Sequence, residues 1–393
     1  MSNPIDHIRG YHAELIEIRR DLHAHPELAF QESRTSTKVV EWLKKWGIET
    51  HTGLARTGVV GVVKGKKNGN RAVGLRADMD CLPIPEANEF AYKSKHPGRM
   101  HACGHDGHTT MLLGAARYLA ETRNFEGTAY LIFQPAEEGG GGGQVMVKEG
   151  LFDKFPANEV YALHNWPVMP PGKIAVRGGP MMAATDEVQI TVHGRGGHAA
   201  IPQLAVDPVV ATAHIITALQ TIASRSVNPL DAVVVSMCSM QTSQLGAFNV
   251  IPESVQLIGT VRSFRPETRD LAEKKVKEIA TRVAEALGAT ATVEYSRGYP
   301  ATVNSEREAQ FAARVGERIF GKGNVVTDAE PTMGGEDFSY MLQARPGAYV
   351  WLGQGGGPGN CFLHNPRFDF NDAVIPLGAG YLAALVEEAL PLK

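Results

Sequence analysis

Three histidines, a cysteine and an aspartate occupy eight consecutive positions, His101-Ala-Cys103-Gly-His105-Asp106-Gly-His108. Thiolate and imidazole are good ligands for zinc and similar transition metals. A Cys-x-His pair cannot place both side chains on one helix face, but a tight loop containing glycine can bring them together. The alternative is a polar helix start that Asp106 and His108 cap. Taken singly, His101 and His108 fit a structural or ligand-orienting role better than metal binding.

A pair of glutamates, Glu137 and Glu138, follows the apolar residues 130–133 in Gln134-Pro-Ala-Glu-Glu. Neighbouring side chains at a strand end point in different directions, so one Glu can bind metal while the other faces a water molecule. A ligand beside a general base is an arrangement suited to hydrolysis. Taken alone, the pair would also suit an ordinary solvated surface. The glycines at 139–143 lack the Lys-Ser/Thr of a phosphate loop, which favours a flexible or closely packed backbone.

Two single histidines and two aspartates gain significance from their positions. His164 ends the apolar stretch at 160–164, and His364 lies in Cys-Phe-Leu-His-Asn. A lone histidine of this kind is more often a satisfied core residue than a ligand. However, ligands in open α/β sheets gather at the carboxyl ends of strands, and His164 is expected there. Asp78 and Asp80 follow another apolar strand, where they would bind metal, orient a ligand histidine or simply form a turn.

A further set of polar residues lies in the second half of the chain. His198 follows a Gly-Arg-Gly-Gly segment, Asn249 precedes Val-Ile-Pro, and Arg262 ends the apolar strand Gly-Thr-Val-Arg. An arginine in such a strand needs a partner, and a substrate carboxylate is a good one. The alternative is an arginine on the solvent face of an alternating strand.

The elements that must position these residues alternate between strand and helix in the first half of the chain. The apolar patterns predict helices at 3–23, 33–46 and 108–122. They predict strands between these helices and after them, at residues 58–63, 72–76, 130–134 and 160–164. This alternation indicates a mixed α/β sheet with helices on both faces.

The pattern changes near residue 185. From residue 186 to 297 the expected order is β-α-β-β-α-β, the ferredoxin-like arrangement of a complete small α+β domain. The helix and strand patterns after it resume the larger domain. We therefore expect a catalytic α/β domain formed by residues 1–185 and 298–393, interrupted by an inserted domain at 186–297.

Composition excludes several classes of protein. The chain has 393 residues, with 39 Lys and Arg against 42 Asp and Glu, so its formal net charge is -3. A strongly basic nucleic-acid binder is thereby excluded as the default. No uninterrupted apolar run is long enough for a membrane span, and the first 25 residues do not resemble a signal peptide. Four cysteines are too few for a disulfide scaffold, and we expect a cytoplasmic protein with reduced thiols.

Taken together, the motifs resemble the aminoacylase/hippurate hydrolase family of co-catalytic dinuclear metallopeptidases. The branch includes hippurate hydrolases, indole-acetyl-amino-acid hydrolases and N-acetyl-diaminopimelate deacetylases. The resemblance runs from about residue 10 to the C-terminus and rests on the segments Asp-Leu-His-Ala-His-Pro-Glu27, Arg-Ala-Asp-Met-Asp80, Met-His-Ala-Cys-Gly-His-Asp-Gly-His108, Gln-Pro-Ala-Glu-Glu138, Gly-Arg-Gly-Gly-His-Ala199 and Met-Gly-Gly-Glu-Asp-Phe338.

The resemblance implies a site for two divalent metal ions, zinc or else manganese, cobalt or nickel. It implies Glu137 as the general acid/base. Beside this site, Asp78 and Asp80 are our candidates for residues that orient the ligands. The implied ligands, among which Cys103 would bridge the two ions, are Cys103, His105, Glu138, His164 and His364.

The resemblance also implies that the inserted domain serves as a lid and for dimerisation, in a homodimer or a dimer-based homotetramer. His198 would reach the partner subunit's site and polarise the scissile carbonyl, while Asn249 and Arg262 would hold the substrate carboxylate. The implied reaction is metal-dependent hydrolysis of N-acyl amino acids, either of the benzoylglycine type or N-acetylated. The partner is thus a small molecule, with neither nucleic acid nor membrane involved.

Three other functions remain open at this point. The same scaffold would serve a small-peptide carboxypeptidase or dipeptidase. Cys103 would be the nucleophile of a thiol hydrolase, with a nearby histidine as its base. A metal-binding or peptide-binding protein would need no general base beside a ligand, so the Glu137-Glu138 pair argues against it. The acyl group, the amino acid, the native metal and the assignment of ligands to each ion are not readable from the sequence.

Overall fold

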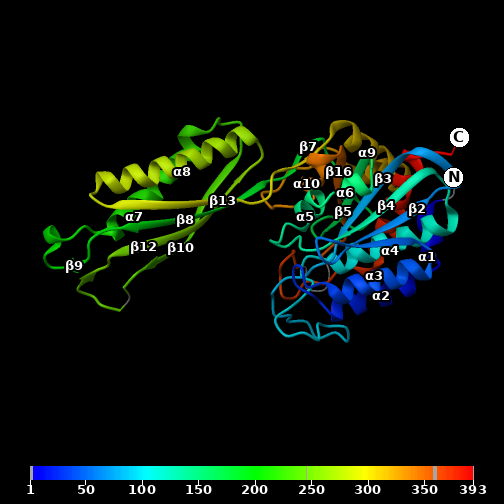
Figure 1. The fold of residues 1–393 in the computed structure, drawn as a ribbon, viewed down its shortest axis with the longest axis horizontal. Helices are drawn as coiled ribbons and strands as arrows, with labels where there is room; N and C mark the ends of the chain where they lie inside the picture. The colour runs from blue at the N-terminus through cyan, green and yellow to red at the C-terminus, as the bar shows by residue number, and fades with distance from the viewer. Residues whose placement is uncertain (1–2, 245, 357–360, 393) are drawn as a thin grey trace. The chain divides into compact units, whose positions relative to one another are not determined.

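The computed structural model describes residues 3–244, 246–356 and 361–392. Within it the chain forms two compact units (Figure 1). The large unit contains residues up to Met181, Thr302–Glu330 and the chain from Asp337 onward. The small unit contains Met182–Ala301 and Pro331–Glu336. The small unit is therefore formed mainly by one continuous segment that interrupts the large unit in sequence.

An eight-stranded mixed sheet forms the centre of the large unit, in the order β1-β2-β4-β3-β5-β16-β6-β15. The four central strands β4, β3, β5 and β16 are parallel, so their carboxyl ends lie at one edge of the sheet. The strands span β1 (Glu49–Leu54), β2 (Gly58–Lys64), β3 (Lys67–Asp78), β4 (Glu126–Gln134), β5 (Glu159–Trp166), β6 (Ile174–Ala175), β15 (Val325–Val326) and β16 (Gly347–Gly353); β7 (Gly179–Met182) and β14 (Thr302–Asn304) form a separate pair.

Helices cover both faces of this sheet, and its central strands are therefore buried on both sides. Leu163 and Leu352 meet Met111 of α4 around Gly378 of α11, whereas the opposite face at Gly74 meets Ala157. The helices on the face covered by α4 and α11 are α1 (Pro4–Arg9), α2 (His12–Ala24), α3 (Ser33–Lys45), α4 (His105–Thr122), α9 (Glu306–Phe320) and α11 (Ile375–Ala389). The remaining helices of the large unit are α5 (Gly142–Lys148), α6 (Leu151–Lys154) and α10 (Ser339–Ala344). The expected fold class, a mixed α/β sheet with helices, is confirmed.

One expected helix is divided in two. The pattern over residues 3–23 predicted a continuous helix, but α1 ends at Arg9 and α2 begins at His12. Asn3 caps the start of α1 by accepting a hydrogen bond from the Ile5 amide at 3.1 Å. At the break, the Gly10 amide donates to the carbonyl of His7 at 3.0 Å. Glycine has low helix propensity, and it ends the first helix here.

The small unit has the strand order β10-β12-β8-β13, with every neighbouring pair antiparallel. This is the ferredoxin-like arrangement expected from the sequence. Its regular elements are β8 (Ala184–His193), α7 (Pro208–Leu219), β10 (Val233–Thr242), β12 (Ser254–Ser263), α8 (Pro266–Ala286) and β13 (Thr290–Arg297), with the short pair β9 (Gly197–His198) and β11 (Val250–Ile251).

Short helical turns complete the chain at Pro202–Leu204, Ile222–Ser226, Lys322–Asn324 and Asp372–Val374. Among the residues that the structure describes, no helix is both long enough and apolar enough to cross a bilayer.

Candidate metal centre and active site

The expected metal ligands converge from four separate parts of the large unit. They come from the start of α4, the loop after β4, the end of β5 and the loop after β16. The ligand atoms of Cys103, His105 and His164 all lie within 4.8 Å of one another, as do those of Cys103, Glu138 and His364. Cys103 is thus common to two three-residue groups, which is the geometry that a ligand shared between two ions needs.

The distances within this cluster suit cation binding. Cys103 Sγ lies 3.4 Å from His164 Nε2, and His364 Nε2 lies 3.3 Å from Glu138 Oε1. His105 Nε2 and Glu138 Oε1 are buried and make no hydrogen bond among the described residues, although they lie 3.9 Å from each other and therefore at ion-pair distance. Buried polar atoms without a hydrogen bond are rare, and a metal ion would satisfy both. The Cys, His and Glu donors therefore fit divalent transition-metal ions.

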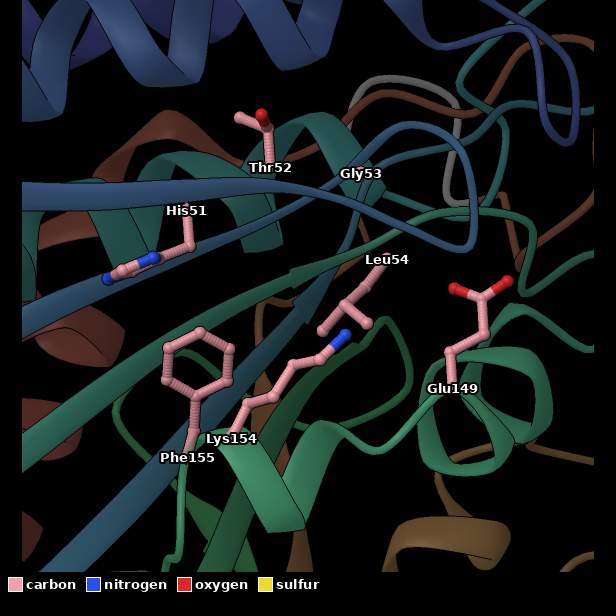
Figure 2. A pocket seen from close by; sticks show the side chains of 7 residues that line it. All are labelled: His51, Thr52, Gly53, Leu54, Glu149, Lys154 and Phe155. Atoms are coloured by element: carbon pink, nitrogen blue, oxygen red, sulfur yellow. The ribbon is translucent and has the colours of Figure 1, made fainter.

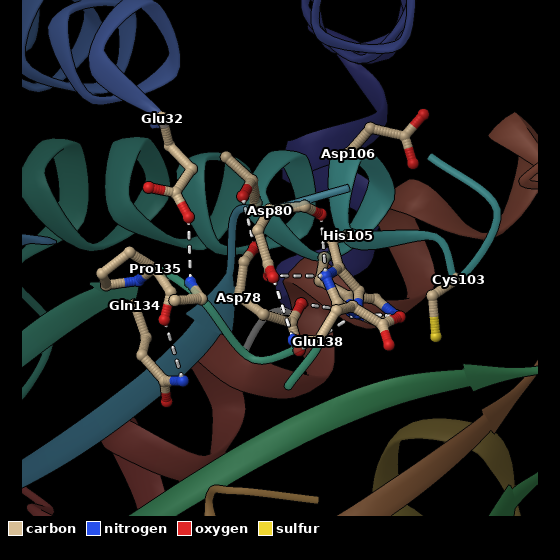
Figure 3. Close-up of polar contacts among 12 residues, drawn as sticks. Glu32, Asp78, Asp80, Cys103, His105, Asp106, Gln134, Pro135 and Glu138 are labelled. Carbon is tan, nitrogen blue, oxygen red and sulfur yellow. Dashed lines mark hydrogen bonds and ion pairs between the residues drawn. The ribbon is translucent and has the colours of Figure 1, made fainter. Parts of the chain in front are cut away.

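Asp80 fixes the orientation of one ligand and ties it to another (Figure 3). Nδ1 of His105 lies 2.9 Å from the Asp80 carbonyl oxygen and 3.2 Å from Oδ1. The second carboxylate oxygen of Asp80 accepts a hydrogen bond from the Glu138 amide at 2.9 Å. Because Nδ1 is engaged by Asp80, Nε2 of His105 is directed toward the cluster.

Asp78 lies at the edge of the cluster, with Oδ2 3.8 Å from Nε2 of His105, and its hydrogen bonds go to supporting residues. Its Oδ1 accepts from Nδ1 of His108 at 2.6 Å, and its Oδ2 accepts from Arg76 at 2.8 Å. The other ring nitrogen of His108 contacts Asn165, whose carbonyl oxygen lies 2.7 Å from Nδ1 of His164. Asp78 and His108 thus position the strand end that carries a ligand.

The electrostatic environment shifts the pKa values of two buried candidate ligands, His105 and His164, in opposite directions. Burial disfavours a charged His105, but Asp78, Asp80 and Glu138 outweigh it and raise the pKa of His105 to about 10. Burial, together with the neighbouring His108, holds the pKa of His164 well below its usual value. Burial thus favours the neutral form of the His164 imidazole, which is the form that binds metal.

Glu137 lies beside the cluster on a tightly packed loop. One of its carboxylate oxygens lies within 4.8 Å of the ligand atoms of His105 and Glu138. The preceding residue, Ala136, donates its amide hydrogen to Oε1 of Glu32 at 2.9 Å (Figure 3). A Cβ on Gly142 would lie 1.7 Å from the carbonyl oxygen of Pro135. Close backbone packing against this loop therefore accounts for part of the glycine run at 139–143.

The three expected site residues of the small unit fall into two separate places. His198 pairs with Val250, and the neighbouring Ala199 amide donates to the carbonyl of Asn249 at 2.9 Å, so His198 and Asn249 are neighbours. Arg262 pairs with Thr185 near the start of β8, whereas Ser254 pairs with His193 at its end. Eight residues of strand correspond to ~27 Å. The structure thus brings His198 and Asn249 together near one end of the sheet and leaves Arg262 at the other.

Arg262 is half-buried, and its guanidinium group forms no ion pair or hydrogen bond among the residues described. Burial lowers the pKa of its guanidinium group. A partly desolvated cation without a partner suits an incoming carboxylate.

Two residues of this site were not assigned a role from the sequence. Asn165 joins His108 to His164, and its place directly after a candidate ligand was the available signal. His23 is fully buried, and its Nδ1 lies 2.8 Å from Oδ2 of Asp106 at the start of α4. A histidine on the apolar face of a helix gives only a weak sign of such a contact.

The structure also contains a hollow of about 740 Å³ at the edge strand β1 (Figure 2). Its lining residues are His51, Thr52, Gly53, Leu54, Glu149, Lys154 and Phe155. The Ala55 amide donates a hydrogen bond to Oε2 of Glu149 there, at 2.6 Å. No group of metal-ligand side chains lines this hollow, so we place the chemistry at the Cys103 cluster.

Residues 74–388 match the family described as peptidase family M20/M25/M40. The chain belongs to this family. Among its M20 relatives is a hippurate hydrolase from Campylobacter jejuni, 40% identical over 383 residues that cover 98% of both chains. An N-acetylcysteine deacetylase from Bacillus subtilis is 36% identical, covering 96% of this chain and 97% of the relative. A solved dinuclear metal-binding peptidase of the M20 family from B. subtilis superposes with a TM-score of 0.84 at 33% identity, covering 97% of this chain and 99% of the other.

Proposed function

We propose that this M20 protein is a metal-dependent amidohydrolase that cleaves N-acyl amino acids to a carboxylic acid and a free amino acid. The observation that carries the proposal is the pair of ligand groups sharing Cys103, with Glu137 beside them. The hippurate hydrolase and the N-acetylcysteine deacetylase support it, because each matches nearly the whole chain. Benzoylglycine-type and N-acetyl amino acids are the two substrate types to test first.

Glu137 is the proposed general acid/base. Two divalent ions, of zinc, manganese, cobalt or nickel, would be held by the Cys103 cluster and would supply Lewis acidity when bound. Glu137 takes a proton from the attacking water while the water oxygen forms a bond to the amide carbon. When the carbon–nitrogen bond breaks, Glu137 gives the proton to the leaving amine. The products are one carboxylic acid and one free amino acid.

The small unit supplies the proposed substrate contacts, and its geometry favours a homodimer. Arg262 and Asn249 would hold the substrate carboxylate, and His198 would polarise the scissile carbonyl. Arg262 lies ~27 Å along the sheet from the end that carries the other two. An N-acyl amino acid is much shorter than this, so with these proposed roles the two ends would serve different active sites. A homodimer, alone or within a tetramer, provides them.

Exposed apolar side chains on the small unit offer a surface that a second copy would cover. Met240 on the edge strand β10 is 54% exposed and Ile258 is 48% exposed. Unpaired edge strands commonly associate with another strand.

Subunit complementation tests the dimer. A Glu137→Ala variant and a His198→Ala variant are each expected to be inactive alone. After the subunits of an equimolar mixture have exchanged, half of the dimers contain one subunit of each variant. One of the two sites in each such mixed dimer has both an intact Glu137 and an intact His198. We expect about a quarter of wild-type activity to return. No recovery after verified exchange would show that His198 acts within its own subunit.

The surroundings of Cys103 argue against a thiol hydrolase. Reactive thiolates lie in electropositive, partly exposed surroundings. Here, burial and the carboxylates of Glu138 and Glu137 raise the pKa of Cys103 well above its usual value. A metal-ligand role suits this residue better. A cytoplasmic location would suit the proposal too, because this thiol must stay reduced to bind metal.

The test of function is a panel of N-acyl amino acids and dipeptides, assayed with metal content measured on the same sample. We expect hydrolysis of N-acyl amino acids, loss of activity with a chelator, and recovery on adding metal. Activity that survives complete metal removal would favour the thiol mechanism. Faster cleavage of dipeptides would favour the dipeptidase alternative.

A further inference from the structure

We infer that Asp337 is a positioning residue that fixes both ends of the loop carrying Glu137. This inference rests on the proposed function, in which Glu137 is the general acid/base. Asp337 belongs to the segment Met-Gly-Gly-Glu-Asp-Phe338, for which neither the metal ligands nor the proposed substrate contacts account. The loop in question, called the Glu137 loop below, is formed by residues 135–141 and leads from the end of β4 to the start of α5.

The carboxylate of Asp337 binds the residues that flank the Glu137 loop. At the end of β4, Nε2 of Gln134 donates to Oδ1 of Asp337 at 2.7 Å and to Oδ2 at 2.9 Å. In the first turn of α5, the Gly143 amide donates to Oδ2 at 2.7 Å. All three residues are buried, so water does not compete for these hydrogen bonds. One carboxylate therefore determines where the Glu137 loop begins and where it ends.

Arg76 on β3 orients this carboxylate. Its Nη2 donates to Oδ1 of Asp337 at 3.0 Å, and its Nε donates to Oε1 of Gln134 at 2.9 Å. Its Nη1 donates to Oδ2 of Asp78 at 2.8 Å. Hydrogen bonds between charged groups are the strong ones, and the planar guanidinium group gives them a fixed geometry. The flanks of the Glu137 loop are thus held in register with the end of β3, beside the metal cluster.

The Glu137 loop needs this support because its backbone is strained. Ala136, directly before Glu137, has a φ of +56°. A left-handed conformation is unfavourable for alanine and persists only where the surrounding structure holds it. If the flanks were released, the loop would relax and carry the Glu137 carboxylate away from the cluster. Glu138 is less dependent on the flanks, because its amide has its own hydrogen bond to Asp80.

The close approach of Asp337 also explains one glycine of the run at 139–143. A Cβ on Gly143 would lie 2.8 Å from the carbonyl oxygen of Asp337 and 3.2 Å from its Oδ2. Gly143 lies within α5, where alanine has the higher intrinsic helix propensity. The position therefore accommodates glycine for the sake of the contact with Asp337.

Two variants release the Glu137 loop in different ways. Asp337→Asn keeps the shape of the side chain but places an NH2 group where an oxygen accepts hydrogen bonds. Gly143→Ala displaces the same carboxylate and changes no charge. Glu159→Gln is the matched control, because Glu159 is also a buried carboxylate that accepts from Arg71 and from the Tyr161 hydroxyl. Glu159 lies at the start of β5, whereas the Glu137 loop follows the end of β4, which runs in the same direction in the sheet.

Hydrogen exchange followed by mass spectrometry measures the loop directly in the metal-loaded protein. We expect faster exchange at residues 135–143 in Asp337→Asn and Gly143→Ala, with unchanged exchange at residues 160–163 of β5. Both variants should retain two metal ions and lose at least ~10-fold in kcat with KM changed less than ~2-fold, because a displaced general base affects the chemical step. Glu159→Gln should show wild-type exchange in the loop and a kcat within ~2-fold of the wild type.

Three results would overturn the inference while leaving the proposed function intact. The first is wild-type exchange at residues 135–143 in both folded variants. The second is an unchanged kcat in both, and the third is a fall in kcat that accompanies loss of metal. If Asp337→Asn does not fold, Gly143→Ala decides alone. If the wild-type protein hydrolyses no N-acyl amino acid, the proposed function fails, but faster exchange of the loop in the variants still supports the role of Asp337 in fixing it.

Discussion

Replacement of Gly104 by alanine should disrupt the metal centre by displacing a residue that supports its ligands. Gly104 separates Cys103 from His105 and has a φ of +99°, a conformation that residues with a Cβ rarely adopt. An added Cβ would lie 2.3 Å from Oδ1 of Asn165. That oxygen is 2.5 Å from Nε2 of His108, in a part of the molecule where all three residues are buried. The Asn165 side chain must therefore move and lose its contact with His108.

The expected cost follows from two contributions. The left-handed backbone conformation costs an alanine about 1–2 kcal/mol relative to glycine. Displacing the Asn165 amide leaves buried polar groups unsatisfied, which costs a further ~1–3 kcal/mol. We therefore expect Gly104→Ala to lower the free energy of unfolding by about 2–5 kcal/mol.

Gly98→Ala is the matched control, because Gly98 has a φ of +78° but nothing within 4 Å of an added Cβ. It should show the backbone cost of about 1–2 kcal/mol alone. Denaturant unfolding of metal-free protein, followed by tryptophan fluorescence, reports on the large unit, which contains every tryptophan of the chain: Trp42, Trp46, Trp166 and Trp351. Metal content after purification should fall for Gly104→Ala and not for Gly98→Ala. Equal destabilisation by the two substitutions would refute the role assigned to Asn165.

Glu137→Ala should retain both metal ions but lose at least ~100-fold in kcat, because general acid/base catalysis contributes on this scale; loss of metal together with activity would make Glu137 a ligand. Arg262→Ala should reduce kcat/KM for free-acid substrates far more than for their methyl esters, and equal losses would contradict its contact with the carboxylate. His23 has a pKa raised to about 9, because Asp106 and Glu86 together outweigh burial. Its stabilising contribution is therefore complete below pH 6.5 and is lost as the pH rises through 9, an effect on the order of 3 kcal/mol. His23→Gln should flatten this dependence in unfolding measured at pH 6 and 9.5, and an unchanged slope would exclude His23 as its source.

The local patterns of the sequence were sufficient to predict the fold class. The alternation of strands and helices predicted the mixed sheet, and the β-α-β-β-α-β order predicted the topology of the small unit. The very short strands were not predictable. β6 and β15 have two residues each, too few for a period to be visible, and their place in the sheet depends on pairing with distant segments.

The candidate ligands were predictable by type, whereas their supporting contacts were not. Cys103 and His105 were identified from a dense local motif. By contrast, the contact between Asn165 and His108 joins residues 57 positions apart. No local pattern encodes such a pair, because the contact depends on how β5 packs beside α4. The separation of Arg262 from His198 likewise follows from the register of β12, which the sequence does not specify.

The start of α4 is the point at which the separate parts of the centre are joined. The His364 amide donates to the carbonyl of Ala102 at 2.7 Å, so the loop after β16 is attached directly beside Cys103. On the other side, Asp106 contacts His23 of α2, and Thr109 donates to the carbonyl of Asp78 at the end of β3. Because three distant segments are fixed to one helical turn, a shift of that turn would move ligands of both groups together. Substitutions there should therefore reduce binding of both metal ions, whereas a change confined to a single ligand should affect one ion first.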